Sequence, residues 1–282
     1  MTHIPQAADI LITGAGGRLG RLLRRAAARE GTGGLRPAFQ SRRPGTGLTW
    51  APGQPLSALP HCDTVVALWG RTSGDAAALA ENAALVAFGH TVALATGARR
   101  LFHLSSAAVY GPGRHLAEGA PLSPVADYGH SKQAMEQEIA RLPRTDRIAH
   151  CCLRLANVVG ADSLAPGLRG SGPVGMDRFD DGTGPLRSYI APGDLLRVLA
   201  GLASLPPDSL PETLNIAAPA PVRMDALVRA RGLDLDWRPA PPGATQEVSL
   251  DTARLSALLP GAIRHDTAEA MVADWAALEA GQ

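Results

Sequence analysis

A glycine-rich turn between an apolar run and an amphipathic segment is the feature that most constrains the fold of this 282-residue chain. Residues 10–13 predict a buried strand, and residues 21–30 carry leucine and alanine at helical spacing. Between them, glycines stand three residues apart at Gly14, Gly17 and Gly20. Such a turn lets the backbone approach a phosphate, which then faces the N–H groups and positive dipole end of the following helix. The pattern therefore predicts a dinucleotide-binding βαβ unit, with a purely structural glycine turn as the alternative.

Strand-like and helix-like segments go on alternating along the first 160 residues, which indicates right-handed βαβ units and a parallel sheet. The predicted strands are 35–40, 64–68, 101–105 and 149–155, and the predicted helices are 75–96 and 131–142. Farther on, a helix at 194–205 and a strand at 214–217 lie between segments with little periodicity. We predict an α/β fold in which residues 1–160 form a Rossmann-type doubly wound parallel sheet, to which 188–218 returns. Residues 161–187 and 219–282 are predicted to form a small C-terminal substrate lobe.

Composition excludes several other classes of protein. Hydrophobic residues make up 45% and charged residues 19%, which excludes a disordered chain. A net charge of +1 without a basic stripe disfavours a nucleic-acid partner. No apolar run approaches the ~18–20 residues of a membrane span, and no secretory signal precedes residue 10. Three cysteines without a C-x-x-C pair and eight scattered histidines predict no disulfide framework, no metal site and a cytoplasmic location.

The residues about 20 positions after the turn bear on the choice of cofactor. NAD-preferring enzymes usually place Asp or Glu there, on the adenosine ribose. Here Gln40, Ser41, Arg42 and Arg43 stand instead. Guanidinium forks and a hydroxyl suit a 2′-phosphate, and Arg18 in the turn would add charge. The sequence thus favours NADP over NAD, unless Arg42 and Arg43 merely form a solvated loop, which would leave the choice open.

The only lysine among the 27 basic residues, Lys132, follows Tyr128 by four positions. On a helix the two lie one turn apart on the same face. A tyrosine with a nearby ammonium can act as a general base, because the positive charge lowers the pKa of the phenol. Ser106 follows the predicted strand 101–105, at the sheet edge where α/β proteins bind ligands. A helical surface pair and a serine that caps a turn are the structural alternatives.

Taken in order, these features resemble the short-chain dehydrogenase/reductase superfamily, and most closely its extended branch, the NAD-dependent epimerase/dehydratase family. The matching stretches cover nearly the whole chain: 13–20, 104–111, 127–132, 154–160, 181–184, 187–194, 214–216 and 249–251. By position, the resemblance implies that Ser106, Tyr128 and Lys132 are catalytic. It also implies that Asn157 contacts a substrate diphosphate and that Arg187 grips it. The expected cofactor contacts are Gly14, Gly17, Arg18, Leu19, Gly20, Ser41, Arg42, Leu68, Tyr128 and Lys132.

Departures from the family pattern leave several functions open. Ala107 stands where the 4,6-dehydratase branch has an acidic residue, so we do not expect dehydration. Residues 68–71 replace smaller ones, so we expect the cofactor's edge to be packed differently. The first hypothesis is an NAD(P)-dependent oxidoreductase acting on a sugar or nucleotide sugar. The alternatives are a nucleotide-sugar (UDP-hexose 4-type) epimerase with tightly bound NAD, and a non-catalytic dinucleotide sensor. The helices near 75–96 and Tyr128 either form a homodimer interface or only pack on the sheet.

Overall fold

The central element of the fold is a seven-stranded parallel sheet with the strand order β12-β7-β5-β4-β1-β2-β3. The computed structural model describes residues 7–45, 47–143 and 148–280. The strands are β1 (Ile10–Ile12), β2 (Pro37–Ser41), β3 (Leu48–Thr49), β4 (Thr64–Ala67), β5 (Arg100–Ser106), β7 (Ala149–Leu155) and β12 (Thr213–Ile216). The order reverses beside β1, as in a doubly wound sheet. The predicted Rossmann-type α/β fold is therefore confirmed.

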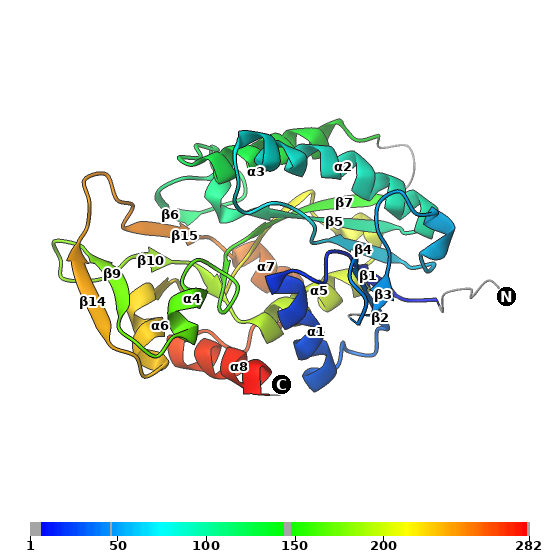
Figure 1. Ribbon diagram of the computed structural model, residues 1–282. Coiled ribbons are helices and arrows are strands. Elements are labelled where there is room, and N and C mark those ends of the chain that lie inside the picture. Colours follow the sequence, from blue (N-terminus) through cyan, green and yellow to red (C-terminus); the bar gives the residue numbers. More distant parts are fainter. Residues whose placement is uncertain (1–6, 46, 144–147, 281–282) are drawn as a thin grey trace.

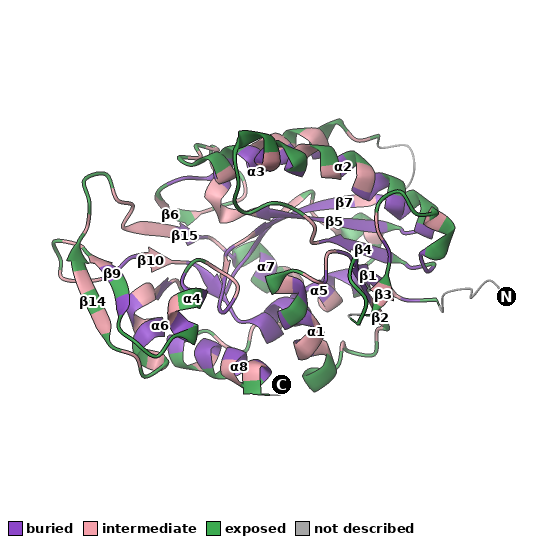
Figure 2. Cartoon of the chain, in the orientation of Figure 1, coloured by how far each residue is buried: buried purple, intermediate pink, exposed green. Residues whose placement is uncertain are grey.

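Helices cover both faces of this sheet (Figure 1). On one face lie α2 (Ala76–Thr96) and α3 (Asp127–Arg141), which pack against each other. On the other lie α1 (Arg18–Glu30), α5 (Pro192–Ser204) and α8 (Ala268–Ala280). The helix α1 buries Leu22, Leu23 and Ala26, the stripe that its periodicity predicts. The sheet between the two helix layers is largely buried (Figure 2).

Two helices begin three or more residues earlier than the sequence predicts. The helix α1 begins at Arg18, directly after the glycine turn, and not at residue 21. The helix α3 begins at Asp127 and not at residue 131, which places Tyr128 in its first turn. Glycine inside a helix lowers the confidence of a helix prediction, so Gly20 and Gly129 obscured the first turns of both helices. Each glycine is buried at a position where a side chain would clash.

Short strands that the sequence did not reveal lie within the predicted substrate-lobe segments and in other parts of the chain. A four-stranded sheet has the order β13-β10-β15-β6, and two further pairs are β11-β8 and β14-β9. Their bounds are β6 (Gly113–Leu116), β8 (Asn157–Val158), β9 (Val174–Arg178), β10 (Leu186–Arg187), β11 (Tyr189–Ile190), β13 (Val222–Arg223), β14 (Leu235–Pro239) and β15 (Glu247–Leu250). The short helices α4 (Ala165–Arg169), α6 (Met224–Ala230) and α7 (Ala253–Leu258) complete this part.

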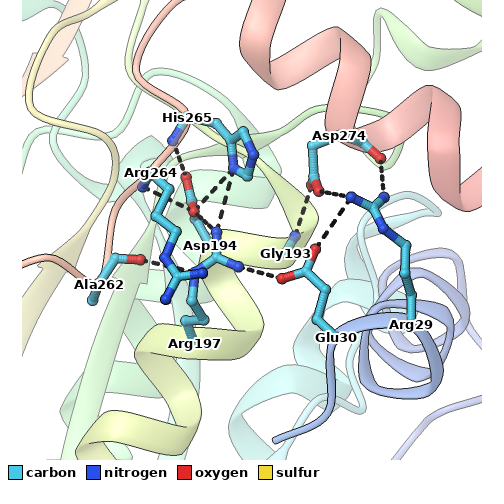
Figure 3. Close-up of polar contacts among 9 residues, drawn as sticks. All are labelled: Arg29, Glu30, Gly193, Asp194, Arg197, Ala262, Arg264, His265 and Asp274. Atoms are coloured by element: carbon cyan, nitrogen blue, oxygen red, sulfur yellow. Dashed lines mark hydrogen bonds and ion pairs between the residues drawn. The ribbon is translucent and has the colours of Figure 1, made fainter. Parts of the chain in front are cut away.

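A polar cluster links α8 and the segment that precedes it to α1 and α5 (Figure 3). The carboxylate of Asp194 on α5 is fully buried and accepts hydrogen bonds from the backbone N–H groups of Arg264 and His265. Asp274 on α8 accepts one from the N–H of Gly193. Arg197 pairs with both Asp194 and Glu30 of α1. The two buried carboxylates thus join α5 to the segment before α8 and α8 to the start of α5, and Arg197 adds an ion pair to α1.

The helix α2 corrects one expectation about the sequence. By length and composition it is apolar enough to cross a membrane, although no such segment was expected. Its many alanines raise the mean hydropathy, while Glu81 and Asn82 interrupt the run. Asn82 and His90 are buried against the protein. The helix packs on β4, β5 and α3, which is the usual position of a helix in a doubly wound fold.

Candidate active site

The glycine turn keeps its shape because neighbouring backbone closes in on it. Gly14 has φ +66°, and a Cβ there would lie 2.9 Å from the backbone nitrogen of Trp69. A Cβ on Gly20 would lie 2.4 Å from Cα of Ala15, so α1 packs directly on the turn. Gly17 caps α1 without any side-chain hydrogen bond, and no acidic residue stands in the first helical turn. The first N–H groups of α1 are thus left for an anion, which fits a dinucleotide phosphate.

The end of β2 lies beside this turn. The buried side chain of Gln40 accepts a hydrogen bond from the Gly14 N–H at 3.0 Å. Ser41 is also buried, and its Oγ accepts from the N–H of Arg43 at 3.1 Å. A Cβ on Gly16 would lie 2.7 Å from that Oγ. Arg42 is exposed. Two residues were predicted to hold the adenosine end of the cofactor. Of these, Ser41 packs against the glycine turn, and Arg42 is exposed to solvent.

Two of the three predicted catalytic side chains meet at the carboxyl end of β5. Ser106 is the last residue of β5, and Tyr128 lies in the first turn of α3. Their hydroxyls are hydrogen-bonded, and this bond lowers the pKa of Tyr128, but burial outweighs it and raises that pKa above its ordinary value. The Ser106 Oγ also accepts from the N–H of Ala108 at 3.2 Å. Both side chains line a cavity of about 870 Å³ that Arg18 and Leu19 reach from the glycine turn.

Lys132 lies buried one helical turn below Tyr128. Its Nζ donates to the carbonyl oxygen of Leu104 at 2.7 Å and lies 3.6 Å from the sulfur of Met135. Burial lowers the pKa of Lys132 to about 8. The Nζ is 6.0 Å from the centroid of the Tyr128 ring. In this arrangement the ammonium faces a backbone carbonyl, and burial and Ser106 are what shift the pKa of Tyr128. That Lys132 lowers the pKa of the phenol stays a prediction.

Asn82 on α2 supports the residues around Lys132, and the sequence analysis did not name it. Its Oδ1 accepts from the N–H of Arg71 at 2.8 Å, while its Nδ2 donates to the Arg71 carbonyl at 3.0 Å and to Ser131 Oγ at 3.1 Å. A Cβ on Gly70 would lie 2.9 Å from Asn82 Oδ1 and 3.5 Å from the Nζ of Lys132. Asn82 thus fastens the loop after β4 onto α3. A lone polar residue in an alanine-rich helix was the available signal.

The loop after β4 also contains Leu68, a predicted cofactor contact. Its backbone carbon would lie 3.2 Å from a Cβ on Gly14, and its side chain packs against the core below the sheet. Trp69 follows and packs on Phe88 with ring centroids 5.2 Å apart. Leu68 therefore borders the glycine turn through its backbone.

The predicted substrate residues Asn157 and Arg187 line the same cavity as Ser106 and Tyr128. The guanidinium of Arg187 donates to three backbone carbonyls, those of residues 186, 245 and 246, at 2.6 to 2.8 Å. Burial lowers its pKa. Among the described residues no carboxylate lies within ion-pair distance of this group, although Glu247 acts on its charge from farther away. The guanidinium can therefore still pair with an anion.

A carboxyl–phenol pair that the sequence did not predict also borders the cavity. The Tyr189 hydroxyl donates to Asp162 Oδ2 at 2.7 Å, and burial raises the pKa of Asp162. The side chain of Asn157 hydrogen-bonds to the same hydroxyl. No pattern in the sequence distinguishes Asp162 from other loop carboxylates. Across residues 7–45, 47–143 and 148–280, no group of three His, Cys, Asp or Glu side chains is arranged to hold a metal.

Comparisons with known proteins identify relatives of this chain. The model of the NAD dependent epimerase/dehydratase family matches residues 10–169. A UDP-glucose 4-epimerase from Lactobacillus helveticus is 32% identical over 99 residues, which are 34% of this chain and 26% of that relative. The chain thus matches about a quarter of the length of this curated relative.

Solved structures resemble the whole chain. MoeE5 in complex with UDP-glucose and NAD has a TM-score of 0.77 at 22% identity, covering 97% of this chain and 99% of that one. UDP-glucuronic acid 4-epimerase from Bacillus cereus, in complex with UDP-glucuronic acid and NAD, has a TM-score of 0.78 at 15% identity, covering 97% and 100%. At these identities the likeness concerns the fold.

Proposed function

This chain belongs to the NAD dependent epimerase/dehydratase family, and from that premise we propose that it transfers hydride at a secondary alcohol or ketone of a sugar or nucleotide sugar. One observation carries the proposal. The hydroxyls of Ser106 and Tyr128 meet in a cavity that extends to the glycine turn, with Lys132 buried beneath them. These are the groups that hold and move a proton next to a bound dinucleotide.

Each of these residues has a distinct part in the reaction. When bound, the dinucleotide supplies or accepts the hydride. The turn residues Gly14 and Gly17 and the first turn of α1, with Arg18, would hold its phosphates. The Tyr128 hydroxyl exchanges a proton with the substrate oxygen, and the Ser106 hydroxyl donates a hydrogen bond to that oxygen. Because burial raises the pKa of Tyr128, the phenolate needs a nearby positive charge, which Lys132 supplies from the same face of α3.

The proposal includes a preference for NADP over NAD. No carboxylate stands at the end of β2, where Ser41 is followed by Arg42 and Arg43. Arg42 is exposed there, and its charge acts on Glu81, which pairs with Arg71. Replacing Arg42 with alanine is expected to weaken NADPH binding at least tenfold and to leave NADH binding within about twofold, because the guanidinium would meet only the 2′-phosphate. Equal losses for both dinucleotides, measured by fluorescence titration, would contradict the preference.

A nucleotide-sugar 4-epimerase is the second candidate. The observation that favours it is Arg187, whose guanidinium lines the cavity without a carboxylate partner among the described residues and suits a diphosphate. The epimerase would use the same Ser106, Tyr128 and Lys132, first to oxidise and then to reduce one carbon, without net consumption of the dinucleotide.

Analysis of the retained dinucleotide separates the two candidates. The purified protein is denatured without added cofactor, and the supernatant is assayed for NAD and NADP by mass spectrometry. Near-stoichiometric NAD would favour the epimerase and contradict the NADP preference. An empty protein that binds NADPH more tightly than NADH, and oxidises it in the presence of a keto sugar, supports the oxidoreductase. A Tyr128→Phe variant that keeps full turnover would reject both.

We further propose a cytoplasmic protein that forms a homodimer. The described cysteines are all free and buried, which suits a reducing compartment. The adjacent helices α2 and α3 offer an outer face on which the side chain of Leu94 is 52% exposed. Sedimentation at several protein concentrations tests the dimer.

A further inference from the structure

We propose that Glu136 is a positioning residue for the reaction: its buried carboxylate fixes the end of β5 against α3 and keeps Lys132 positively charged. This inference rests on the proposed function. Neither the sequence motifs nor the catalytic roles described above include Glu136.

The first observation is the placement of Glu136 on α3. Tyr128, Lys132 and Glu136 follow one another at intervals of four, so they lie on one face of the helix. That face packs against β5 and β7. The Glu136 side chain is only 11% exposed. A carboxylate buried to this extent is costly unless several donors satisfy it.

The first donor belongs to the strand that carries Ser106. The Ser105 hydroxyl donates to Glu136 Oε1 at 2.5 Å. Ser105 is buried, whereas Ser106 is only half-buried and bonds to Tyr128. Glu136 therefore holds the Ser105 side chain in the interior. Because side chains alternate along a strand, the side chain of Ser106 then points to the opposite side, toward the cavity.

The second donor is a guanidinium on β7. Arg154 Nη2 lies 2.8 Å from Glu136 Oε2, and Arg154 Nε donates to Oε1 at 3.1 Å, so the pair is bidentate. Arg154 Nη1 donates to the Tyr110 hydroxyl at 2.8 Å, which in turn donates to Asn215 on β12 at 2.8 Å. The carboxylate thus ties the loop after Ser106, through Tyr110, to two strands of the sheet. Such a connected network restricts motion of the site.

The charges that face Lys132 come from three elements. Glu136 lies on α3, Cys152 on β7 and His103 on β5. Burial raises the pKa of the Cys152 thiol well above its ordinary value, and burial lowers the pKa of His103 to about 3, so both are neutral near pH 7. Of these groups Glu136 is the one that carries negative charge. It opposes the effect of burial on Lys132 and favours the ammonium form.

Removing the carboxylate therefore has a predictable electrostatic effect. In Glu136→Gln the negative charge is lost, and the guanidinium of Arg154 remains without its counter-ion. The net charge of the pair changes from zero to positive, which has the same sign as the Lys132 ammonium. The pKa of Lys132 must then fall further. If Arg154 is changed to Gln as well, the pair is neutral again and the pKa should return toward the wild-type value.

Because Lys132 is the only lysine of the chain, it can be titrated alone. Full-length protein labelled with ¹³C at lysine Cε gives one resonance, whose shift is followed against pH. We expect Glu136→Gln to move the midpoint to lower pH by about half a unit or more, and the double variant with Arg154→Gln to reverse most of this shift. Arg154→Lys is avoided because it would add a second resonance. The matched control is Glu138→Gln, which removes a more exposed carboxylate of the same helix.

The outcomes separate a positioning role from a structural one. A midpoint that stays the same in Glu136→Gln and Glu138→Gln would overturn the electrostatic part. The pH at which kcat falls should follow the NMR midpoint, whereas damaged folding would lower kcat equally at every pH. If Glu136→Gln does not fold, Ser105→Ala tests the positional part with both charges kept. We expect about a tenfold loss of kcat with little change of KM, and an unchanged kcat would overturn it.

The titration needs no substrate, so it also separates this inference from the proposed function. A shifted midpoint in a protein that transfers no hydride would reject the function and leave the effect of Glu136 on Lys132 standing. Hydride transfer by the wild type together with an unshifted midpoint in Glu136→Gln would support the proposed function and reject the effect of Glu136 on Lys132.

Discussion

Replacing Lys132 with methionine is expected to inactivate the protein and to make it more stable at neutral pH. Methionine has a similar length and keeps the apolar contacts of the lysine side chain, but it carries no charge. The buried ammonium is costly, because its pKa falls from the ordinary 10.5 to about 8 when the chain folds. That fall corresponds to about 3 kcal/mol of unfavourable free energy for the ammonium form.

The lost hydrogen bond of Lys132 offsets part of this gain in folding stability. The Nζ of Lys132 donates to the Leu104 carbonyl at 2.7 Å, and methionine leaves that carbonyl without a donor. An unsatisfied buried acceptor costs about 1–3 kcal/mol. The net stabilisation at neutral pH is therefore about 1 kcal/mol.

The pH dependence is a sharper test than the net value. Since the pKa of Lys132 is lower in the folded state than in the unfolded chain, the cost of the ammonium is fully present below pH 8. It disappears as the pH rises from about 8 toward 10.5, because the folded protein releases its proton first. The wild type thus gains stability in this range, by up to about 1.4 kcal/mol per pH unit, and Lys132→Met does not.

Urea unfolding at several pH values between about 6 and 9.5 measures this difference directly. Effects of other titrating groups cancel when the variant is compared with the wild type. The control is Arg141→Met, which removes a cation that is 70% exposed on the same helix and should leave the pH slope unchanged. Parallel stability curves for Lys132→Met and the wild type would refute the reasoning, because they would mean that Lys132 keeps an ordinary pKa in the folded protein.

Three further substitutions test the site and its surroundings. Tyr128→Phe should lower kcat about a thousandfold while dinucleotide affinity stays within about twofold in a fluorescence titration, since only the proton-transferring hydroxyl is lost. Gly16→Ala should weaken dinucleotide binding about tenfold, because its Cβ would lie 2.7 Å from a buried hydroxyl beneath the turn. Gly160→Ala should cost about 3 kcal/mol in urea unfolding: the residue has φ +84°, and a Cβ would lie 2.2 Å from Trp275 Nε1. Wild-type values for any variant would contradict its part of the argument.

The central sheet could be predicted because each of its main strands is a short apolar run that can be recognised without knowing its neighbours in the fold. The strand at 149–155 has the predicted bounds, the one at 64–68 ends one residue earlier, and the one at 101–105 extends one residue farther at each end. The strands outside the central sheet gave no such signal. The parallel pair of β9 with β14 joins segments about 60 residues apart, and β14 ends in proline. Their pairing depends on tertiary contacts, which short runs rich in glycine and proline do not reveal.

The predicted site residues come together for a similar reason. Ser106 and Tyr128 lie at the ends of a strand and a helix, and the ends of parallel strands share one edge of the sheet. Glu136 and Asn82 escaped prediction because their importance lies in partners far along the chain, such as Arg154 and Ser131. A buried carboxylate and a solvated one look alike in a sequence until the opposing element is known.

The position of the sole lysine now has a physical explanation. In a chain with 26 arginines, the ammonium at Lys132 lies between the carbonyl of Leu104 and the sulfur of Met135, and even a Cβ on Gly70 would come within 3.5 Å of it. A planar guanidinium is larger than an ammonium and keeps its charge at every accessible pH, so it would not fit this enclosure and could not titrate there. A lysine fits, and burial brings its pKa to about 8. The same burial that makes Lys132 costly for folding gives the site a proton equilibrium near neutral pH, where arginine has none.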